Sequence, residues 1–174
     1  MSAPTPVVCN AGPLITLAKL NLLHLLEELY GQVRFSQSVY DEAVTQGIRQ
    51  GYEDARTLWA FLDQMKWRPE ELSPDEVPDH LREAPLDRGE RDTLVLAITV
   101  RSRLVLMDET EGRRVARAQG FAVRGSMGVL IQAFRQSLMS ADQLRLNLTE
   151  MARRQDIWVN PTLAERLLRE VLGG

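Results

Sequence analysis

Cysteine and histidine are scarce in this sequence of 174 residues. Cys9 is the only cysteine, so the chain can form no internal disulfide and no cysteine-based metal cage. We expect Cys9, within an apolar strand, to be a small buried residue rather than a reactive thiol. Because His24 and His80 are the only histidines, we expect neither zinc chemistry nor a histidine-based catalytic triad.

Long hydrophobic runs are also missing, since no apolar stretch approaches the roughly 18 residues that a membrane helix needs. The N-terminal residues MSAPTP have neither a basic region nor a signal-peptide core, so we expect a cytoplasmic protein without membrane contact. The net charge of -3 gives no general attraction to nucleic acid. Any contact with nucleic acid therefore needs a local patch, and its cations would be arginines, because Lys19 and Lys66 are the only lysines.

What is present is ordinary for a globular protein, with 44% hydrophobic and 26% charged residues, and the length suits one domain covering 1–174. The pattern predicts strands at 6–9, 33–35, 66–69, 104–107 and 121–123. It predicts helices from Pro13, then at 22–30, 37–46, 54–64, 87–100, 110–119, 126–138, 140–154 and 162–172. The segment 47–51 is expected to be a loop, and 69–86 to be mostly loop. Asn21, Ser36, Ser126 and Ser140 are the expected helix caps. Short apolar strands that alternate with helices predict an α/β fold around a mostly parallel sheet.

Polar side chains follow the strands, where parallel sheets bind ligands. Asn10 follows the first strand, and Glu42 lies a turn or two beyond the second. Further acids surround the fourth strand: Asp108, Glu109 and Glu111 after it, and Asp87, Glu90 and Asp92 in the preceding helix. Such oxygen ligands suit Mg²⁺ or Mn²⁺, which hydrolyse phosphodiesters without histidine or cysteine.

Each of these residues also has a purely local explanation. Asn10 suits a turn, and Glu42 suits a solvated helix surface. Asp87 and Glu90 have the spacing of a capping box. Asp108 suits a helix cap, followed by acids that favour a first helical turn.

Five blocks in order resemble the PIN domain, the small metal-dependent ribonuclease fold of VapC-type toxins. They are VVCNAGPLITLAKLNLLHLLEELY, VRFSQSVYDEAV, LDRGERDTLVLA, LVLMDETEGRRVARAQG and VRGSMGVLIQAFRQSLM. The match is closest to a largely uncharacterised prokaryotic PIN-like group. The resemblance implies a three-layer α/β/α sandwich around a four- to five-stranded sheet, with a core at about 6–139 and a helical extension at about 140–174.

The resemblance implies that Asn10, Glu42, Glu90 and Asp108 share a catalytic metal site, with Mg²⁺ or Mn²⁺ as the cofactor. Asp92 competes with Glu90, because two residues apart on a helix they point nearly opposite ways. We prefer Glu90, which follows Gly89 in the GE pair of the closest group. Asp92, Glu109 and Glu111 form a second tier. Asn10 departs from the carboxylate usual at its position and supplies only a neutral, weaker ligand, although Asn also occurs there in the closest group.

Arginines follow the fourth strand closely. Arg113 and Arg117 share a helix face and Arg114 lies beside Arg117, so the three suit contact with RNA phosphates, a patch that Arg88 and Arg91 could extend. The alternatives are a solvated face paired with Glu109 or Glu111, and pairing with the site acids. By resemblance, a small antitoxin protein and a second copy of the chain are expected partners. Trp59, Phe61 and Trp67 are either interface aromatics or core.

Three functions compete. The first is a metal-dependent endoribonuclease, the toxin of a toxin–antitoxin pair. The second is a PIN-fold module that binds RNA or a partner and has lost strong cleavage, which Asn10 favours. The third, a receiver-like domain phosphorylated on Asp108, lacks paired acids after the first strand and a suitably placed lysine.

Overall fold

The computed structural model describes residues 4–173, in which the strands form one four-stranded parallel sheet with the order β2-β1-β3-β4. The strands are β1 (Val7–Cys9), β2 (Val33–Arg34), β3 (Leu104–Leu106) and β4 (Ala122–Arg124). Val7 of the central strand β1 pairs with Val33 on one side and Leu104 on the other. All four strands are parallel, so their carboxyl ends lie along one edge. The predicted parallel α/β fold is confirmed.

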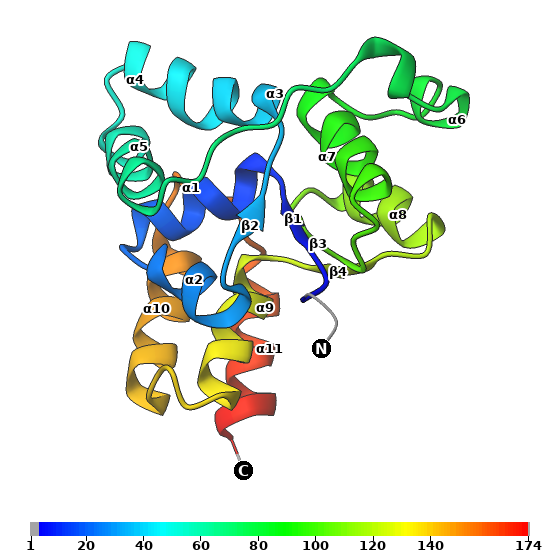
Figure 1. Ribbon diagram of the computed structural model, residues 1–174. Helices are drawn as coiled ribbons and strands as arrows, with labels where there is room; N and C mark the ends of the chain where they lie inside the picture. Colours follow the sequence, from blue (N-terminus) through cyan, green and yellow to red (C-terminus); the bar gives the residue numbers. More distant parts are fainter. Residues whose placement is uncertain (1–3, 174) are drawn as a thin grey trace. The chain divides into compact units, whose positions relative to one another are not determined.

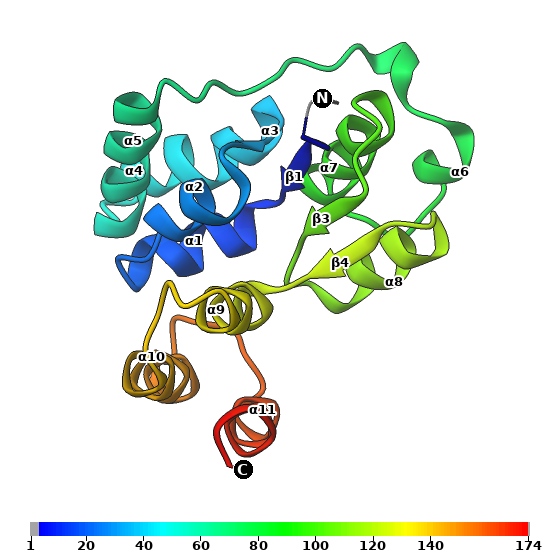
Figure 2. The same ribbon diagram turned by 60° about the horizontal axis from the view of Figure 1, so that its bottom comes forward.

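Two groups of helices cover the two faces of this sheet, which gives the three layers of an α/β/α sandwich (Figures 1 and 2). One group contains α1 (Ala11–Lys19), α2 (His24–Tyr30), α3 (Gln37–Tyr40), the π-helix η1 (Asp41–Gln46), α4 (Gly47–Arg49) and α5 (Glu53–Met65). The other contains α7 (Arg88–Thr99), which packs against β1 and β3, and α8 (Thr110–Ala118), which packs against β4. Buried residues of α7 such as Leu94 and Leu96 form one core cluster with Val8 and Val105 of the sheet. The sheet is thus buried on both faces, as parallel sheets require.

The turn after β1 differs in detail from the predicted one. Helix α1 begins at Ala11 with Asn10 as its N-terminal cap, so Pro13 is its third residue rather than its first. Proline is still tolerated there, because the first turn of a helix leaves its N–H groups without partners. Asn21 adopts a positive φ of 56° and is not the cap of α2, which begins at His24.

The predicted loop at 47–51 is wrong over most of its length, because the chain from Gln37 to Arg49 is helical throughout. Ser36 caps this stretch as predicted, with its hydroxyl accepting a hydrogen bond from the Val39 N–H at 3.3 Å. The middle of the stretch, η1, is wound as a π-helix, a form that occurs mostly as short insertions and often at functional sites.

The segment between α5 and α7 lacks the strand predicted at 66–69. It forms a parallel bridge just beyond β2, in which the N–H of Gln37 donates to the Glu70 carbonyl and the N–H of Glu70 donates to the Phe35 carbonyl, each at 2.9 Å. Arg34 adds a two-pronged ion pair to the Glu70 carboxylate at 2.5 and 2.6 Å. Two short helices follow, the 3₁₀ helix η2 (Pro74–Glu76) and α6 (Asp79–Arg82).

The aromatic residues of α5 and its C-terminal turn divide between core and surface. Trp67 is buried and packs edge-to-face on Phe61, with the ring centroids 5.4 Å apart. Trp67 therefore belongs to the core and the half-buried Phe61 packs on it, whereas Trp59 is 50% exposed.

The chain forms two compact units, one that ends at Ser126 and one that begins at Met127. Helix α9 (Ser126–Arg135) starts at this boundary and ends three residues before the predicted end. In the second unit, α10 (Ala141–Arg153) and α11 (Pro161–Leu172) pack against each other. Ser140 caps α10 in a capping box and Asn160 caps α11. None of the helices in residues 4–173 is long and apolar enough to span a bilayer.

Helix α7 offers a matched test of the core. Leu94 is fully buried between α7 and the sheet, whereas Ile98, one turn later, is 40% exposed. Leu94→Ala leaves a cavity and is expected to lower the free energy of unfolding by about 2–5 kcal/mol. Ile98→Ala is expected to cost about 1 kcal/mol or less. Urea denaturation measures both, and equal losses would contradict the placement of α7.

Candidate active site

The direction in which the chain adds strands to the sheet reverses between β1 and β3. The candidate site lies at the carboxyl ends of these two strands. From β1 the chain crosses to β2 on one side, and it later returns past β1 to β3 and β4 on the other. Ligands of open parallel sheets bind at such a switch point, beyond the carboxyl ends of the strands. Asn10 follows β1, and its backbone N–H donates to the Leu106 carbonyl of β3 at 2.9 Å. Asp108 comes two residues after β3, so the sheet places Asn10 and Asp108 on either side of the switch point.

Asp108 is held from the end of β4 by Ser126. The Ser126 backbone N–H donates to Oδ1 of Asp108 at 2.7 Å, and the Ser126 hydroxyl donates to Oδ2 at 2.6 Å. The prediction that Ser126 caps α9 is therefore corrected, since its hydroxyl is directed to Asp108. Burial raises the pKa of Asp108, although the two Ser126 hydrogen bonds and the charge of Arg113 oppose that shift. The two Ser126 hydrogen bonds thus fix the orientation of the Asp108 carboxylate. Together with Arg113 they offset part of the cost of burying its charge.

Glu42 approaches the site from the first turn of η1. Its Oε2 lies 2.9 Å from the point where a Cβ on Gly89 would stand, and Oδ1 of Asp87 and Oδ1 of Asn10 lie 3.5 and 3.6 Å from the same point. Gly89 thus leaves open a space to which oxygens of three different elements converge. Partial burial and the charges of Asp87, Glu109 and Glu90 raise the pKa of Glu42.

Glu90 serves the helix and the site together. Its Oε2 accepts the Asp87 backbone N–H at 2.9 Å, while Oδ1 of Asp87 accepts the Glu90 N–H at 2.8 Å, which is the predicted capping box. Its other oxygen, Oε1, lies 2.8 Å from where a Cβ on Gly112 would stand. Glu90 is 6% exposed. Burial and the charges of Asp87, Glu109 and Glu111 raise its pKa, against the lowering effect of the Asp87 N–H.

Asn10 is buried at the centre of this arrangement, with 4% of its surface exposed. Its Oδ1 accepts the Thr93 hydroxyl at 3.2 Å, and the same hydroxyl is 2.7 Å from the Gly89 carbonyl. Its neighbour Cys9 is fully buried, and burial together with the charge of Asp108 raises the pKa of that thiol well above its usual value. Cys9 is therefore a packed core residue, as predicted.

The three arginines after β3 have different surroundings. Arg113 is half-buried, and Nη1 donates to the Met107 carbonyl at 3.0 Å. Nη1 of Arg113 and Oδ1 of Asp108 both lie within 3 Å of the point where a Cβ on Gly125 would stand, at 2.6 and 2.8 Å. Arg114 is exposed and pairs with Glu111, which lowers the pKa of that acid. Burial lowers the pKa of the Arg113 guanidinium, and the charge of the nearby exposed Arg117 lowers it further.

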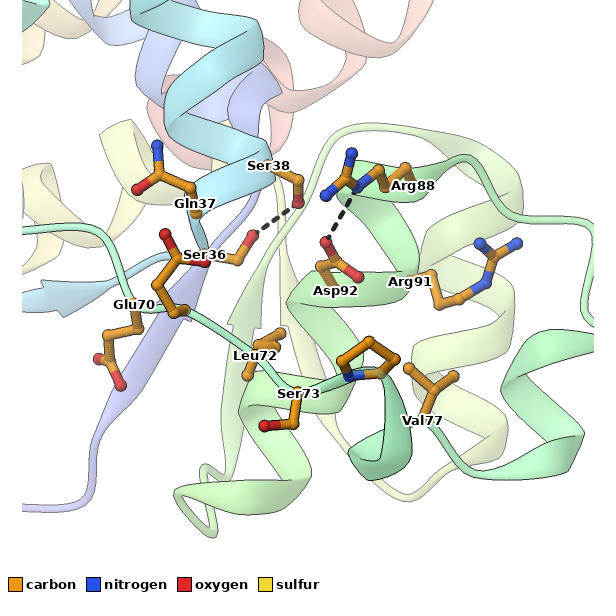
Figure 3. A pocket seen from close by; sticks show the side chains of 12 residues that line it. Ser36, Gln37, Ser38, Glu70, Leu72, Ser73, Val77, Arg88, Arg91 and Asp92 are labelled. Atoms are coloured by element: carbon orange, nitrogen blue, oxygen red, sulfur yellow. Dashed lines mark hydrogen bonds and ion pairs between the residues drawn. The ribbon is translucent and has the colours of Figure 1, made fainter.

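Asp92 lies outside this cluster, on another face of α7. Its carboxylate pairs with Arg88 at 3.7 Å, and both residues line a pocket with the start of α3 and the segment 70–77 (Figure 3). The structure therefore brings Glu90, and not Asp92, to Glu42. Of the second-tier residues, Glu109 and Glu111 are near enough to influence Glu90.

The donor chemistry of the cluster fits a hard divalent cation. Carboxylate and amide oxygens are the ligands that Mg²⁺ and Mn²⁺ prefer. Burial, together with repulsion between the acids, raises the pKa values of Glu42 and Glu90, and an ion would relieve that repulsion. The cradle over Gly89, which a Cβ would fill, collects three such oxygens. As the side chains stand, residues 4–173 contain no group of three or more Asp, Glu, His or Cys residues close enough together to hold an ion. An ion here would therefore draw in Glu42, which is exposed.

Sequence reasoning did not place two residues that touch the cluster. Ser126 was expected to cap another helix, and Thr93 was not considered. Asp87 was among the acids expected around the fourth strand, and its spacing to Glu90 also predicted a capping box. The rule that found Asn10 and Asp108 also covers Ser126, which comes two residues after β4 at the same edge of the sheet. Thr93 follows Glu90 by three residues on the buried face of α7, a spacing that brings two side chains together.

The raised pKa of Glu42 leads to a prediction about stability. The folded chain holds a proton on Glu42 more tightly than the unfolded chain does, so the charged form costs stability above the folded pKa. Glu42→Gln removes that cost. With a chelator present, it is expected to raise the free energy of unfolding at pH 7. The gain should fade as the pH falls from the raised folded pKa toward about 4.3, below which Glu42 is neutral in both the folded and the unfolded chain.

Glu28→Gln is the matched control, because Glu28 is exposed on α2, away from the cluster. Denaturant melts across pH measure both variants. An equal gain from Glu28→Gln, or a gain for Glu42→Gln that does not depend on pH, would contradict the clustering.

The chain was compared with known proteins. A family described as PIN domain matches residues 6–172, which is nearly the whole chain. No curated protein matches it. The fold and the order of its elements agree with the resemblance seen in the sequence. This chain belongs to the PIN domain family.

Proposed function

We propose that this chain hydrolyses phosphodiester bonds of RNA with Mg²⁺ or Mn²⁺. The observation that carries the proposal is the convergence of Glu42, Glu90 and Asp87 beside Asn10, next to Asp108, at the switch point of a PIN-domain sheet. Acids held together at a ligand-binding edge are costly unless a cation joins them. The absence of a histidine or cysteine nucleophile from this cluster is consistent with metal-assisted hydrolysis.

Glu42, Glu90 and Asp108 would hold the ion, with Asn10 as a neutral fourth ligand. The ion supplies charge that stabilises the phosphate oxygens and lowers the pKa of an attacking water. Ser126 keeps the Asp108 carboxylate in one direction. Asp87 and the capping box fix Glu90, so the ligand on α7 does not need to be ordered when the substrate binds.

Arginines at the rim would contact RNA phosphates. Arg117 is exposed and Arg114 forms a surface ion pair, which is easily exchanged for another anion. Arg113 would have a different role, because its guanidinium lies beside Asp108 and would balance charge within the site. Of the arginines first considered for the phosphate patch, Arg114 and Arg117 are therefore the stronger candidates.

A binding module without strong cleavage is the second candidate function, and two observations favour it. Asn10 brings no charge to the position where an acid is expected. Both oxygens of Asp108 already accept hydrogen bonds from Ser126. A site weakened in this way would still present Arg114 and Arg117 to RNA.

We also infer partners for the chain from its likeness to VapC-type toxins. On that likeness it would be the toxin of a pair, held by a small antitoxin, and it would associate with a second copy of itself. Trp59, half exposed on α5, is the residue of the predicted aromatic set that is open to such a partner.

Cleavage of RNA by the purified protein tests the proposal. A pool of structured and unstructured RNAs is incubated with Mn²⁺, Mg²⁺ or EDTA. We expect metal-dependent cleavage that EDTA abolishes and that Asp108→Asn reduces at least about a hundredfold, because a charged ligand is lost. Asp54→Asn on α5, outside the site, is the control and should keep full activity. Cleavage that survives both EDTA and Asp108→Asn would come from a contaminant and would end the nuclease proposal.

Asn10→Asp tests whether Asn10 is a site position with its charge removed. A fourth carboxylate beside Glu42 and Asp87 is expected to tighten Mn²⁺ binding by about tenfold, because affinity for hard cations rises with ligand charge. Isothermal titration with Mn²⁺ alone measures this. Asn21→Asp, in the exposed turn before α2, is the control. An unchanged affinity in Asn10→Asp would remove Asn10 from the site.

A further inference from the structure

A pocket of about 250 Å³ lies on the other side of α7 from the acid cluster. Three segments line it: the beginning of α3, residues 70–77, and the first two turns of α7. Figure 3 shows Leu72, Ser73 and Val77 along one side and Ser38 and Arg88 along the opposite side, with Asp92 between them. The volume is just below the roughly 300–1,000 Å³ of sites for drug-sized ligands, so it suits one small planar group.

Several polar residues line this pocket, and most of them already have partners: Ser36 bonds Ser38, Gln37 bonds Asp41, Glu70 pairs with Arg34, and Arg91 donates to backbone carbonyls. Asp92 and Arg88 pair loosely and supply an acceptor group and a donor group. The Asp92 side chain is 19% exposed, and the Nε atom of its ion-pair partner Arg88 lies 3.7 Å from Oδ2. The Arg88 side chain is 81% exposed, so its pairing with Asp92 contributes little and is readily rearranged. A carboxylate and a guanidinium side by side offer two acceptor oxygens next to several N–H donors.

That pattern matches one RNA base. Guanine presents two adjacent N–H donors, N1–H and N2–H, beside the acceptor O6 on its Watson–Crick edge, and no other standard RNA base has two adjacent donors there. We propose that this pocket binds an unpaired guanine of the RNA, with N1–H and N2–H donating to Asp92, Arg88 donating to O6, and the base lying along Leu72 and Val77. Unstacked bases of single-stranded RNA are read in this way, by contacts to a face and by hydrogen bonds to the edge.

The pocket is joined to the acid cluster by α7 itself. Arg88 and Asp92 lie on either side of Glu90 in the sequence of this helix, and Ser36 of the pocket follows β2 at the same sheet edge as Asn10 and Asp108. The inference rests on the proposed function, because it assigns the pocket to a nucleotide near the phosphate to be cleaved. It adds a preference for guanine, which the acid cluster alone would not supply.

Binding measured in EDTA tests the pocket independently of cleavage. Labelled single-stranded heptamers of uridine with a central G, A, C or U are titrated with the full chain, and fluorescence anisotropy is recorded. We expect the G heptamer to bind about 5- to 150-fold more tightly than the others, the range of one good bidentate base contact. Asp92→Asn should abolish that preference and leave the affinity for the U heptamer unchanged, whereas Asp54→Asn should change neither.

Further measurements keep the outcomes separate. Arg88→Gln, at an exposed position, is a second variant in case Asp92→Asn does not fold, and it should weaken the preference for G. Guanosine monophosphate is titrated as a free nucleotide. Equal binding of all four heptamers, or a G preference that survives in Asp92→Asn, would overturn the pocket and leave the proposed cleavage standing. Binding of guanosine monophosphate without binding of any heptamer would overturn the RNA assignment, and cleavage would then be judged by its own assay.

Discussion

Repulsion between carboxylates held at one edge of a parallel sheet is the constraint on which the candidate site depends. Burial and the neighbouring acids raise the pKa values of Glu42 and Glu90 together. Asp87 and Glu90 cannot move apart, because each accepts the other's backbone N–H, and Asp108 is held by Ser126, whereas the exposed Glu42 is free to move toward an ion. The fold thus stores an unfavourable arrangement of charge at the place where a parallel sheet binds its ligand.

The sequence was sufficient for those parts of the site that follow from strand order. Asn10 and Asp108 were found because each comes just after a short apolar strand, and such strand ends meet at one edge of a parallel sheet. The capping box of Asp87 and Glu90 was also predicted from its spacing, but it was set against a site role for Glu90. In the structure the capping role and the site role of Glu90 are compatible, since one of its oxygens caps the helix and the other faces Gly112.

Other parts depend on packing between distant segments and could not be read locally. Gly47 suggested a loop, yet the chain there continues as a helix after a π-helical stretch, because α5 and α1 pack against it. Ser126 has every local mark of a helix cap, and only the position of Asp108 gives its hydroxyl another partner. Arg113 and Arg117 share a helix face, but Arg113 is turned inward by the Met107 carbonyl and Asp108. Propensity and spacing indicate which conformations and contacts are open to a segment. Packing against neighbouring segments then selects one of them.

The capping box at the start of α7 also sets the angular phase of that helix. Successive residues of an α-helix are about 100° apart around its axis, and the reciprocal bonds of Asp87 and Glu90 define which residue is first. Glu90 therefore faces the acids while Asp92 faces the pocket. An insertion before Asp87 would lengthen a surface segment and leave this division intact. An insertion of one residue between Asp87 and Asp92 would rotate the rest of the helix by more than a quarter turn, and the site and the core face of α7 would be lost together.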